Sequence, residues 1–112
     1  MKLEVKVSEV NEVVVIRLVG SLDSNTAPDA EAEVNKWLGK DSKKMVVDLE
    51  EAKYVSSAGL RVFLATAKKM TAAGGSVMFC SPNEVVKEIL DISGFSNILN
   101  LKVTREEALN EI

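Results

Sequence analysis

Apolar and polar positions alternate with two different periods along this chain, and the periods predict strands and helices in turn. Residues 2–7 alternate at every second position, which predicts a half-buried strand. Residues 13–19 form a denser apolar run that is typical of a strand covered on both faces. The polar residues 9–12 between them read as a hairpin turn around Asn11. Further strands are expected over 45–49 and 77–80, with a short edge strand over 101–103.

Helical spacing of apolar residues appears in the stretches between these strands. After a polar loop over 20–26, one helical face is predicted to bury Ala30, Val34, Trp37 and Leu38. A second helix is expected over about 58–73, ended by two glycines.

Two capping boxes mark the last two helices. Ser81 to Glu84 reads as one box, with Pro82 at the first helical position of a helix that runs to about residue 92. Thr104 to Glu107 reads as a second box that opens a terminal helix.

The order of these elements predicts an α/β fold, with residues 1–112 forming a single domain. Strands alternate with helices, so we expect a mixed, largely parallel sheet of four to five strands packed with about four helices. The loops at the carboxyl ends of the strands form the functional edge of such a sheet. Loops 20–26 and 50–57 lie there, and Asp23 and Ser57 are close together if their strands are neighbours.

The residue types that this chain lacks exclude several classes of function. The 112 residues contain no histidine and one cysteine, Cys80. Without histidine there is no Ser-His-Asp triad, and a structural zinc site has too few ligands. We therefore expect no enzyme activity, no metal and no cofactor. A single cysteine excludes an internal disulfide and favours a reducing compartment, and in an apolar strand it is expected to be a core residue.

Charge and hydropathy exclude two further classes of partner. The net charge is −3 and the isoelectric point is about 5.0, which disfavours nucleic-acid binding. No apolar run approaches the roughly 18 residues of a membrane helix, and the amino terminus lacks the apolar core of a signal peptide. We expect a cytoplasmic protein that binds neither nucleic acid nor membranes. Solvation and turn chemistry account for the carboxylates of Asp48, Glu50 and Glu51.

The two serines before the second long helix are the candidate site. The simplest interpretation makes Ser57 the helix N-cap, worth about 1 kcal/mol. Two adjacent serines exceed what one cap needs, and no acidic residue follows three positions on to complete a capping box. Gly59 is a poor helix former, so its presence in the first turn suggests another reason for a glycine there. We expect that its small size lets another molecule approach. The free N–H groups and the helix dipole would also stabilise a phosphate attached to the serine.

Asp23 and Arg61 are candidate site residues only because they are expected to lie near Ser57. Local sequence makes Asp23 a turn or cap residue, but beside Ser57 it could contact a basic group of a partner and would repel a phosphate. Arg61 belongs to the solvated face of its helix and is near enough to Ser57 to matter.

Three segments in this order give the chain a resemblance to a known family. They are VVVIRLVGSLDSNTAPD, MVVDLEEAKYVSSAGLRVF and VKEILDISGFSNIL. Together they resemble the STAS domain over nearly the whole chain, in its stand-alone form as a bacterial anti-sigma factor antagonist. The resemblance implies that the unmodified protein binds an anti-sigma factor with serine-kinase activity and so frees a sigma factor. Phosphorylation of a serine then breaks the complex, and a serine phosphatase restores it.

The resemblance also implies which residues act. YVSSAGL aligns with the family's aromatic-x-Asp-Ser-Ser-Gly-Leu pattern, which places the phosphate acceptor on Ser57 and an acidic neighbour at Asp23. Two departures, Ser56 for aspartate and Ala58 for serine, leave Ser56 as a rival acceptor. The residues predicted to bind the partner are Asp23, Ser24, Asn25, Thr26, Ser56, Ala58, Gly59, Leu60 and Arg61.

Two other functions remain open. The same domain could be a STAS-type ligand-binding or scaffold module of a larger signalling assembly that is never phosphorylated. A small hydrolase using Ser57 is the weakest alternative, because no base is in view to activate the serine.

Overall fold

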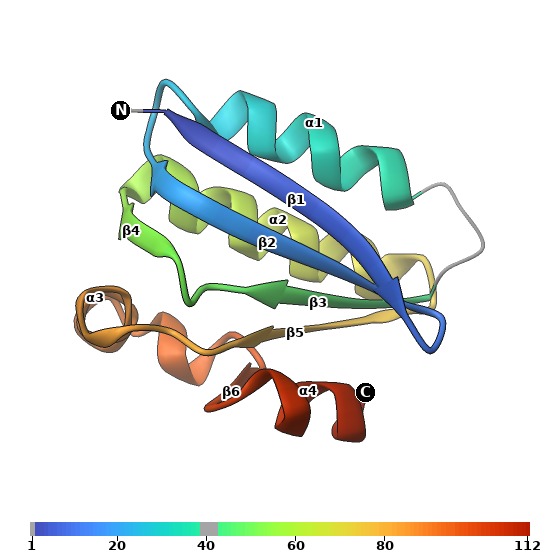
Figure 1. The fold of residues 1–112 in the computed structure, drawn as a ribbon. Coiled ribbons are helices and arrows are strands. Elements are labelled where there is room, and N and C mark those ends of the chain that lie inside the picture. The colour runs from blue at the N-terminus through green and yellow to red at the C-terminus, as the bar shows by residue number, and fades with distance from the viewer. Residues whose placement is uncertain (1, 39–42) are drawn as a thin grey trace.

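The computed structural model describes residues 2–38 and 43–112, and within them six strands form one mixed sheet. The strands are β1 (Leu3–Val10), β2 (Val13–Leu22), β3 (Lys44–Asp48), β4 (Ala52–Val55), β5 (Ser76–Cys80) and β6 (Leu101–Lys102). The helices are α1 (Ala27–Leu38), α2 (Ser57–Ala72), α3 (Glu84–Ile92) and α4 (Arg105–Glu111), with a short 3₁₀ turn over Phe95–Asn97. Figure 1 shows their arrangement.

The sheet begins with the predicted hairpin. β1 and β2 are antiparallel, and the turn residues Asn11 and Glu12 have φ values of 50° and 70°, the left-handed pair that a tight hairpin requires. The remaining neighbours are parallel in the order β2, β3, β5, β6, as expected for strands joined through helices. The α/β class and the mixed, largely parallel sheet are therefore confirmed.

β2 is long enough to pair with two strands on the same side. Its first part, Val14 to Arg17, pairs with β3, and its end, Gly20 to Leu22, pairs with β4 across a register shift. After β3 the chain passes through residues 49–51 and continues in the same direction as β4, beside the end of β2 (Figure 1). The sheet therefore has more strands than the predicted four to five, because β4 lies where a loop was expected. Its four residues are too few for alternation to distinguish a strand from a loop.

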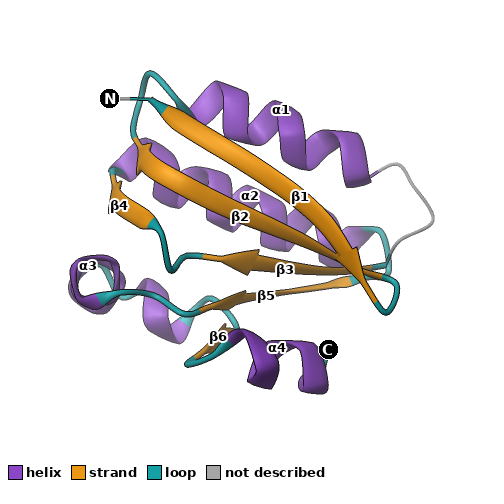
Figure 2. Cartoon of the chain, in the orientation of Figure 1, coloured by secondary structure: helices purple, strands orange, loops and turns teal. Residues whose placement is uncertain are grey.

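Helices cover both faces of the sheet. α1 and α2 lie side by side on one face and enclose the larger core, in which the Phe63 and Phe79 rings are 5.0 Å apart. α4 covers the other face, where Ala108 packs on a smaller cluster that includes Val15, Val46 and Cys80. Figure 2 shows this division into layers.

One of the two predicted capping boxes is wrong. Asn83, and not Ser81, caps α3 by accepting a hydrogen bond from the Val86 N–H at 3.0 Å. Ser81 has a left-handed φ of 56°, so it does not have the extended backbone of an N-cap. The Asn83 amide also donates to the carbonyls of Glu50 and Ala52, a tertiary contact that local sequence does not reveal. The second box is confirmed, since Thr104 Oγ1 accepts from the Glu107 N–H at 3.1 Å.

Gly59 lets the start of α2 lie against the sheet. A Cβ atom at this position would stand 2.8 Å from Leu22 Cγ and 2.9 Å from Val55 Cγ1, closer than side chains tolerate. The expectation that its small size admits another molecule is therefore wrong, because the missing side chain would point into the core.

We expect Gly59→Ala to destabilise the protein by about 1–3 kcal/mol, although alanine favours a helix, because the methyl group would push α2 off β2 and β4. Urea unfolding followed by circular dichroism measures the change. Lys68→Ala, on the exposed face of the same helix, is the control and should stay within about 0.5 kcal/mol of wild type. Equal stability of the two variants would contradict this account of Gly59.

Candidate functional site

The two loops singled out in the sequence meet at one edge of the sheet. Leu22 pairs with Val55, and the Ser56 N–H donates to the Leu22 carbonyl at 2.8 Å. The strands before the loops are thus neighbours, as the expected proximity of Asp23 and Ser57 required. Figure 1 shows the ends of β2 and β4 and the starts of α1 and α2 gathered at this edge.

Asp23 organises the loop that precedes α1. Its Oδ1 accepts the N–H groups of Asn25 at 2.9 Å and Thr26 at 3.1 Å. Thr26 Oγ1 in turn accepts the Asp23 N–H at 2.9 Å and donates to the Ser21 carbonyl at 2.8 Å. The hydrogen bond from the Thr26 N–H is the main cause that holds the pKa of Asp23 below its ordinary value. This edge therefore carries a fixed negative charge at neutral pH.

The two serines have separate roles. Ser56 has the extended backbone of an N-cap, and its Oγ accepts from the Gly59 N–H at 3.4 Å. Ser57 is the first residue of α2, and its exposed hydroxyl has no hydrogen-bond partner within the described residues. The interpretation of Ser57 as the N-cap is therefore wrong, because the helix begins one residue earlier than expected and Ser56 occupies the cap position.

The surroundings of Ser57 favour an anion. The first turn of α2 contains no acidic residue, so the partial positive charge of the helix start is not neutralised there. Arg61 is exposed one turn further on, at the spacing that brings side chains to the same helix face. No carboxylate in the described part of the chain forms an ion pair with it.

Burial divides the residues predicted to bind a partner. Ser24, Asn25 and Arg61 are exposed, and Asp23, Ser56 and Ala58 are half-buried. The side chains of Thr26 and Leu60 are buried, as is Gly59, so these three support the loop and the helix from within. For the other six, partner contact stays a prediction.

A shallow groove of ≈ 500 Å³ separates the starts of α1 and α2 and is named here the α1–α2 groove. It is lined by Ser24, Ala27, Pro28, Glu31, Ala58, Arg61, Val62 and Ala65. Pro28 and Glu31 were missed because only packing shows which residues of α1 face α2. Tyr54, which is 48% exposed and lies two residues before Ser56, was not considered either.

A reactive cysteine, a metal site and a membrane-spanning helix are not found among the described residues. Cys80 is buried, and burial is the main cause that raises the pKa of its thiol to about 11, so it is a poor nucleophile at neutral pH. This agrees with the predicted core role. The described ranges contain no cluster of three side chains suited to hold a metal ion. No helix among them is long and apolar enough to cross a membrane.

Comparison with known proteins matches residues 4–108 to the model of the STAS domain. The Bordetella bronchiseptica protein BtrV, provisionally assigned as an anti-sigma factor antagonist, is 32% identical over 95% of this chain and 91% of its own. The anti-sigma F factor antagonist of Paenibacillus polymyxa is 26% identical over 100% of this chain and 97% of its own.

Among solved structures, the fold matches the anti-sigma factor antagonist SpoIIAA in two states. The unphosphorylated form has a TM-score of 0.80 at 22% identity and covers 96% of this chain and 94% of its own. The phosphorylated form, from Bacillus, has a TM-score of 0.73 at 22% identity and covers 96% and 97%. At 22% identity these two structures show that the chain has the same fold, and they show nothing beyond the fold.

The separate roles of the serines predict different effects on stability. Ser56→Ala removes the cap and should lower the free energy of unfolding by about 1 kcal/mol. Ser57→Ala removes a hydroxyl without a partner and should change it by less than about 0.5 kcal/mol. Urea titration of both variants measures this. The assignment fails if Ser57→Ala is the more destabilised of the two.

The lowered pKa of Asp23 predicts how its loop responds to acid. Because the folded-state pKa lies below the unfolded one, the stabilisation is complete above the unfolded value and is lost as the pH falls through the folded value. The amide proton shifts of Asn25 and Thr26, followed by NMR, should therefore titrate at lower pH than the Asp23 carboxyl does in the urea-unfolded chain. Coinciding midpoints would contradict the hydrogen-bonded loop.

Proposed function

Since the chain belongs to the STAS domain family, we propose that it is an anti-sigma factor antagonist that works by partner switching. The unphosphorylated protein binds an anti-sigma factor, which then releases its sigma factor. Phosphorylation of Ser57 ends this binding. The relatives named above support the first two statements, since they are described as antagonists of anti-sigma factors. We propose further that residues 1–112 act as one STAS domain.

The exposed hydroxyl of Ser57 carries the proposal. It begins a sixteen-residue helix whose first turn has no acidic side chain, and no other described group engages it. A kinase can reach this hydroxyl without unfolding the helix. Ser56 is the poorer acceptor, because its Oγ caps α2 and its side chain is half-buried.

Added charge explains the switch without a large conformational change. A phosphate on Ser57 brings a charge of nearly −2 to the residue that precedes Ala58 of the α1–α2 groove, at the same edge of the sheet as the ionised Asp23. The helix start and Arg61 stabilise this charge on the antagonist itself. An interface that was complementary to the neutral hydroxyl then faces an anion, and binding is lost locally.

The remaining components follow from the same scheme. The anti-sigma factor is proposed to be the serine kinase, and a serine phosphatase regenerates the active antagonist. The chain itself is a substrate and not an enzyme, which fits the absence of histidine from its 112 residues. We place the protein in the cytoplasm, where sigma factors act.

Phosphosite mapping by mass spectrometry on protein purified from its native cells is the first test. We expect phosphate on Ser57 under at least one growth or stress condition. Phosphate on Ser56 alone would support the phosphorylation switch but would show that Ser56, and not Ser57, is the acceptor. No phosphate under any condition would overturn the switch and favour the ligand-binding or scaffold module.

Binding of the anti-sigma factor from the same cells tests the charge mechanism. Ser57→Asp should weaken the complex by about tenfold or more, and Ser57→Ala should bind like wild type yet resist the kinase. Ser8→Asp is the matched control, because it adds the same charge at an exposed serine of β1 away from this edge, and it should bind like wild type. Equal affinities of wild type and Ser57→Asp in a calorimetric titration would refute the mechanism.

A further inference from the structure

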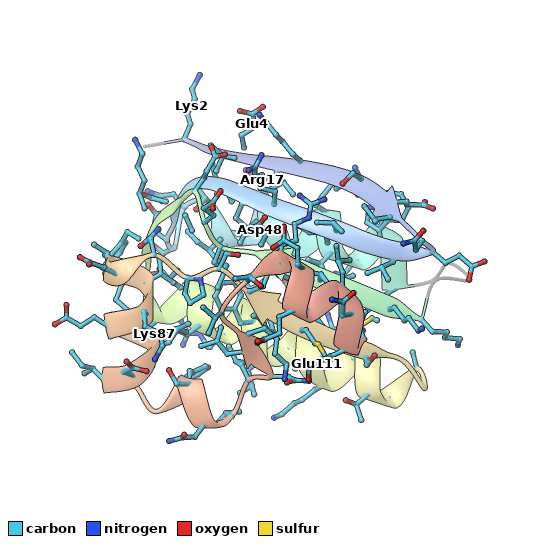
Figure 3. The ribbon with its side chains drawn as sticks, turned by 60° about the horizontal axis from the view of Figure 1, so that its bottom comes forward. Lys2, Glu4, Arg17, Asp48, Lys87 and Glu111 are labelled. Atoms are coloured by element: carbon cyan, nitrogen blue, oxygen red, sulfur yellow. The ribbon has the colours of Figure 1, made fainter. Side chains whose placement is uncertain are left out.

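A second polar pocket lies on the face of the sheet opposite to the α1–α2 groove. Its volume is ≈ 440 Å³, and it lies at the ends of β3 and β5 beside the start of α4. We name it the Asp48 pocket; it is lined by Arg17, Asp48, Glu50, Ser81, Pro82, Asn83, Val103, Thr104, Arg105 and Glu106. Figure 3 shows Arg17 and Asp48 next to each other on this face. Nothing in the proposed switch uses this pocket.

Strand register brings the charged side chains of the pocket together. Arg17 of β2 is paired with Asp48 of β3, and Asp48 is paired with Cys80 of β5. Side chains of paired residues lie on the same face, which is the face that α4 covers. The apolar residues beneath α4, which include Val15 and Val46, are therefore followed by Arg17 and Asp48 toward the carboxyl ends of β2 and β3.

Asp48 is unusual because its acidic side chain is buried. Its residue is only 3% exposed, so of the solvation and turn chemistry expected for this carboxyl group, the solvation is wrong and the turn hydrogen bond is confirmed. Oδ1 accepts the Glu50 N–H at 3.0 Å, which is the only hydrogen bond to this carboxyl group from the described residues. Burial of an acidic group without a cation is costly.

Arg17 does not supply that cation. Its guanidinium pairs with Glu51 at 3.1 Å and with Glu50 at 3.6 Å, and no ion pair joins it to Asp48. The exposed Glu50 and Glu51 thus hold the Arg17 guanidinium, although Arg17 and Glu50 both line the pocket as well. The buried carboxyl of Asp48 thus borders the pocket without a positive partner among the described side chains.

Arg105 is the complementary group in the same pocket. It is the half-buried first residue of α4, and within the described chain no carboxylate pairs with it. The pocket therefore combines the buried Asp48 carboxyl and the half-buried Arg105 guanidinium, neither of which forms an ion pair with a described residue, in a space large enough for a small molecule. The exposed Glu106 also lines this space and is likewise in no such ion pair.

We propose that the Asp48 pocket binds a small zwitterion of the α-amino acid class. The ammonium group donates to Asp48, and the carboxylate accepts from the Arg105 guanidinium, so Asp48 and Arg105 each gain an ionic partner. The hydroxyl groups of Ser81 and Thr104 line the space between and face the rest of the ligand. This inference does not depend on phosphorylation of Ser57.

Binding is tested on the full chain with the twenty standard L-amino acids as probes. Each is compared with the amine that lacks its carboxylate and the acid that lacks its ammonium. The amide shifts of Ser81, Arg105 and Glu106 report binding by ¹⁵N NMR. We expect at least one amino acid to move these signals and to bind at least about tenfold more tightly than either single-charge analogue. No binding by any amino acid, or an amine that binds as tightly, would overturn the proposal.

Two variants connect binding to the proposed groups. Asp48→Asn keeps an oxygen for the Glu50 N–H but lacks the negative charge, and Arg105→Gln changes a residue at the surface end of the pocket. Each should weaken binding by about tenfold or more, and Lys68→Ala, on the exposed face of α2, should leave it unchanged. If Asp48→Asn does not fold, Arg105→Gln decides alone. Unchanged affinity in a folded variant would refute the ligand contacts assigned here.

Discussion

The pairing of β4 with the end of β2 is the constraint on which the rest of this structure depends. It joins segments that are some thirty positions apart through the Leu22–Val55 pair and the hydrogen bond from Ser56 to the Leu22 carbonyl. Gly59 completes the junction, because only a residue without Cβ lets α2 start so close to Leu22. The Asp23 loop and the start of α2 then share one edge without any direct bond between Asp23 and Ser57.

That junction explains why two adjacent serines differ so much. The backbone of Ser56 is held extended by β4 and by Leu22, which is the conformation an N-cap needs, so its hydroxyl turns back toward the helix. Ser57 follows as the first helical residue, and its side chain points to solvent. One serine thus stabilises the helix, and the other is available for modification without loss of the cap.

The two faces of the sheet carry separate chemistry that meets in one loop. Residues 48–52 connect the buried Asp48 to β4, and β4 leads directly to Ser56 and Ser57. The Asn83 side chain fixes this loop by donating to the carbonyls of Glu50 and Ala52 while it caps α3. The loop that borders the Asp48 pocket is therefore held by the same contacts that position the strand leading to Ser56 and Ser57.

Local patterns by themselves determined most of the elements of this protein. Alternation of apolar residues identified β1, and apolar runs identified β2, β3 and β5. Helical spacing and capping motifs identified the helices, and the order of the elements identified the α/β class. The absence of histidine from the sequence also excluded a Ser-His-Asp triad. The hydroxyl pair, the neighbouring acid and the helix start were also visible in the sequence.

Tertiary structure alone decided how those pieces act on one another. β4 is held by pairing with β2 and by Asn83, and four residues carry too short a pattern to reveal that. The choice of Ser56 and Asn83 as caps depends on backbone angles set by distant contacts, so the local motifs pointed to Ser57 and Ser81. The burial of Asp48 depends on strand register and on α4 crossing that face, which no run of neighbouring residues records. Periodicity reports which side of an element is buried, and only the packed chain determines what it is buried against.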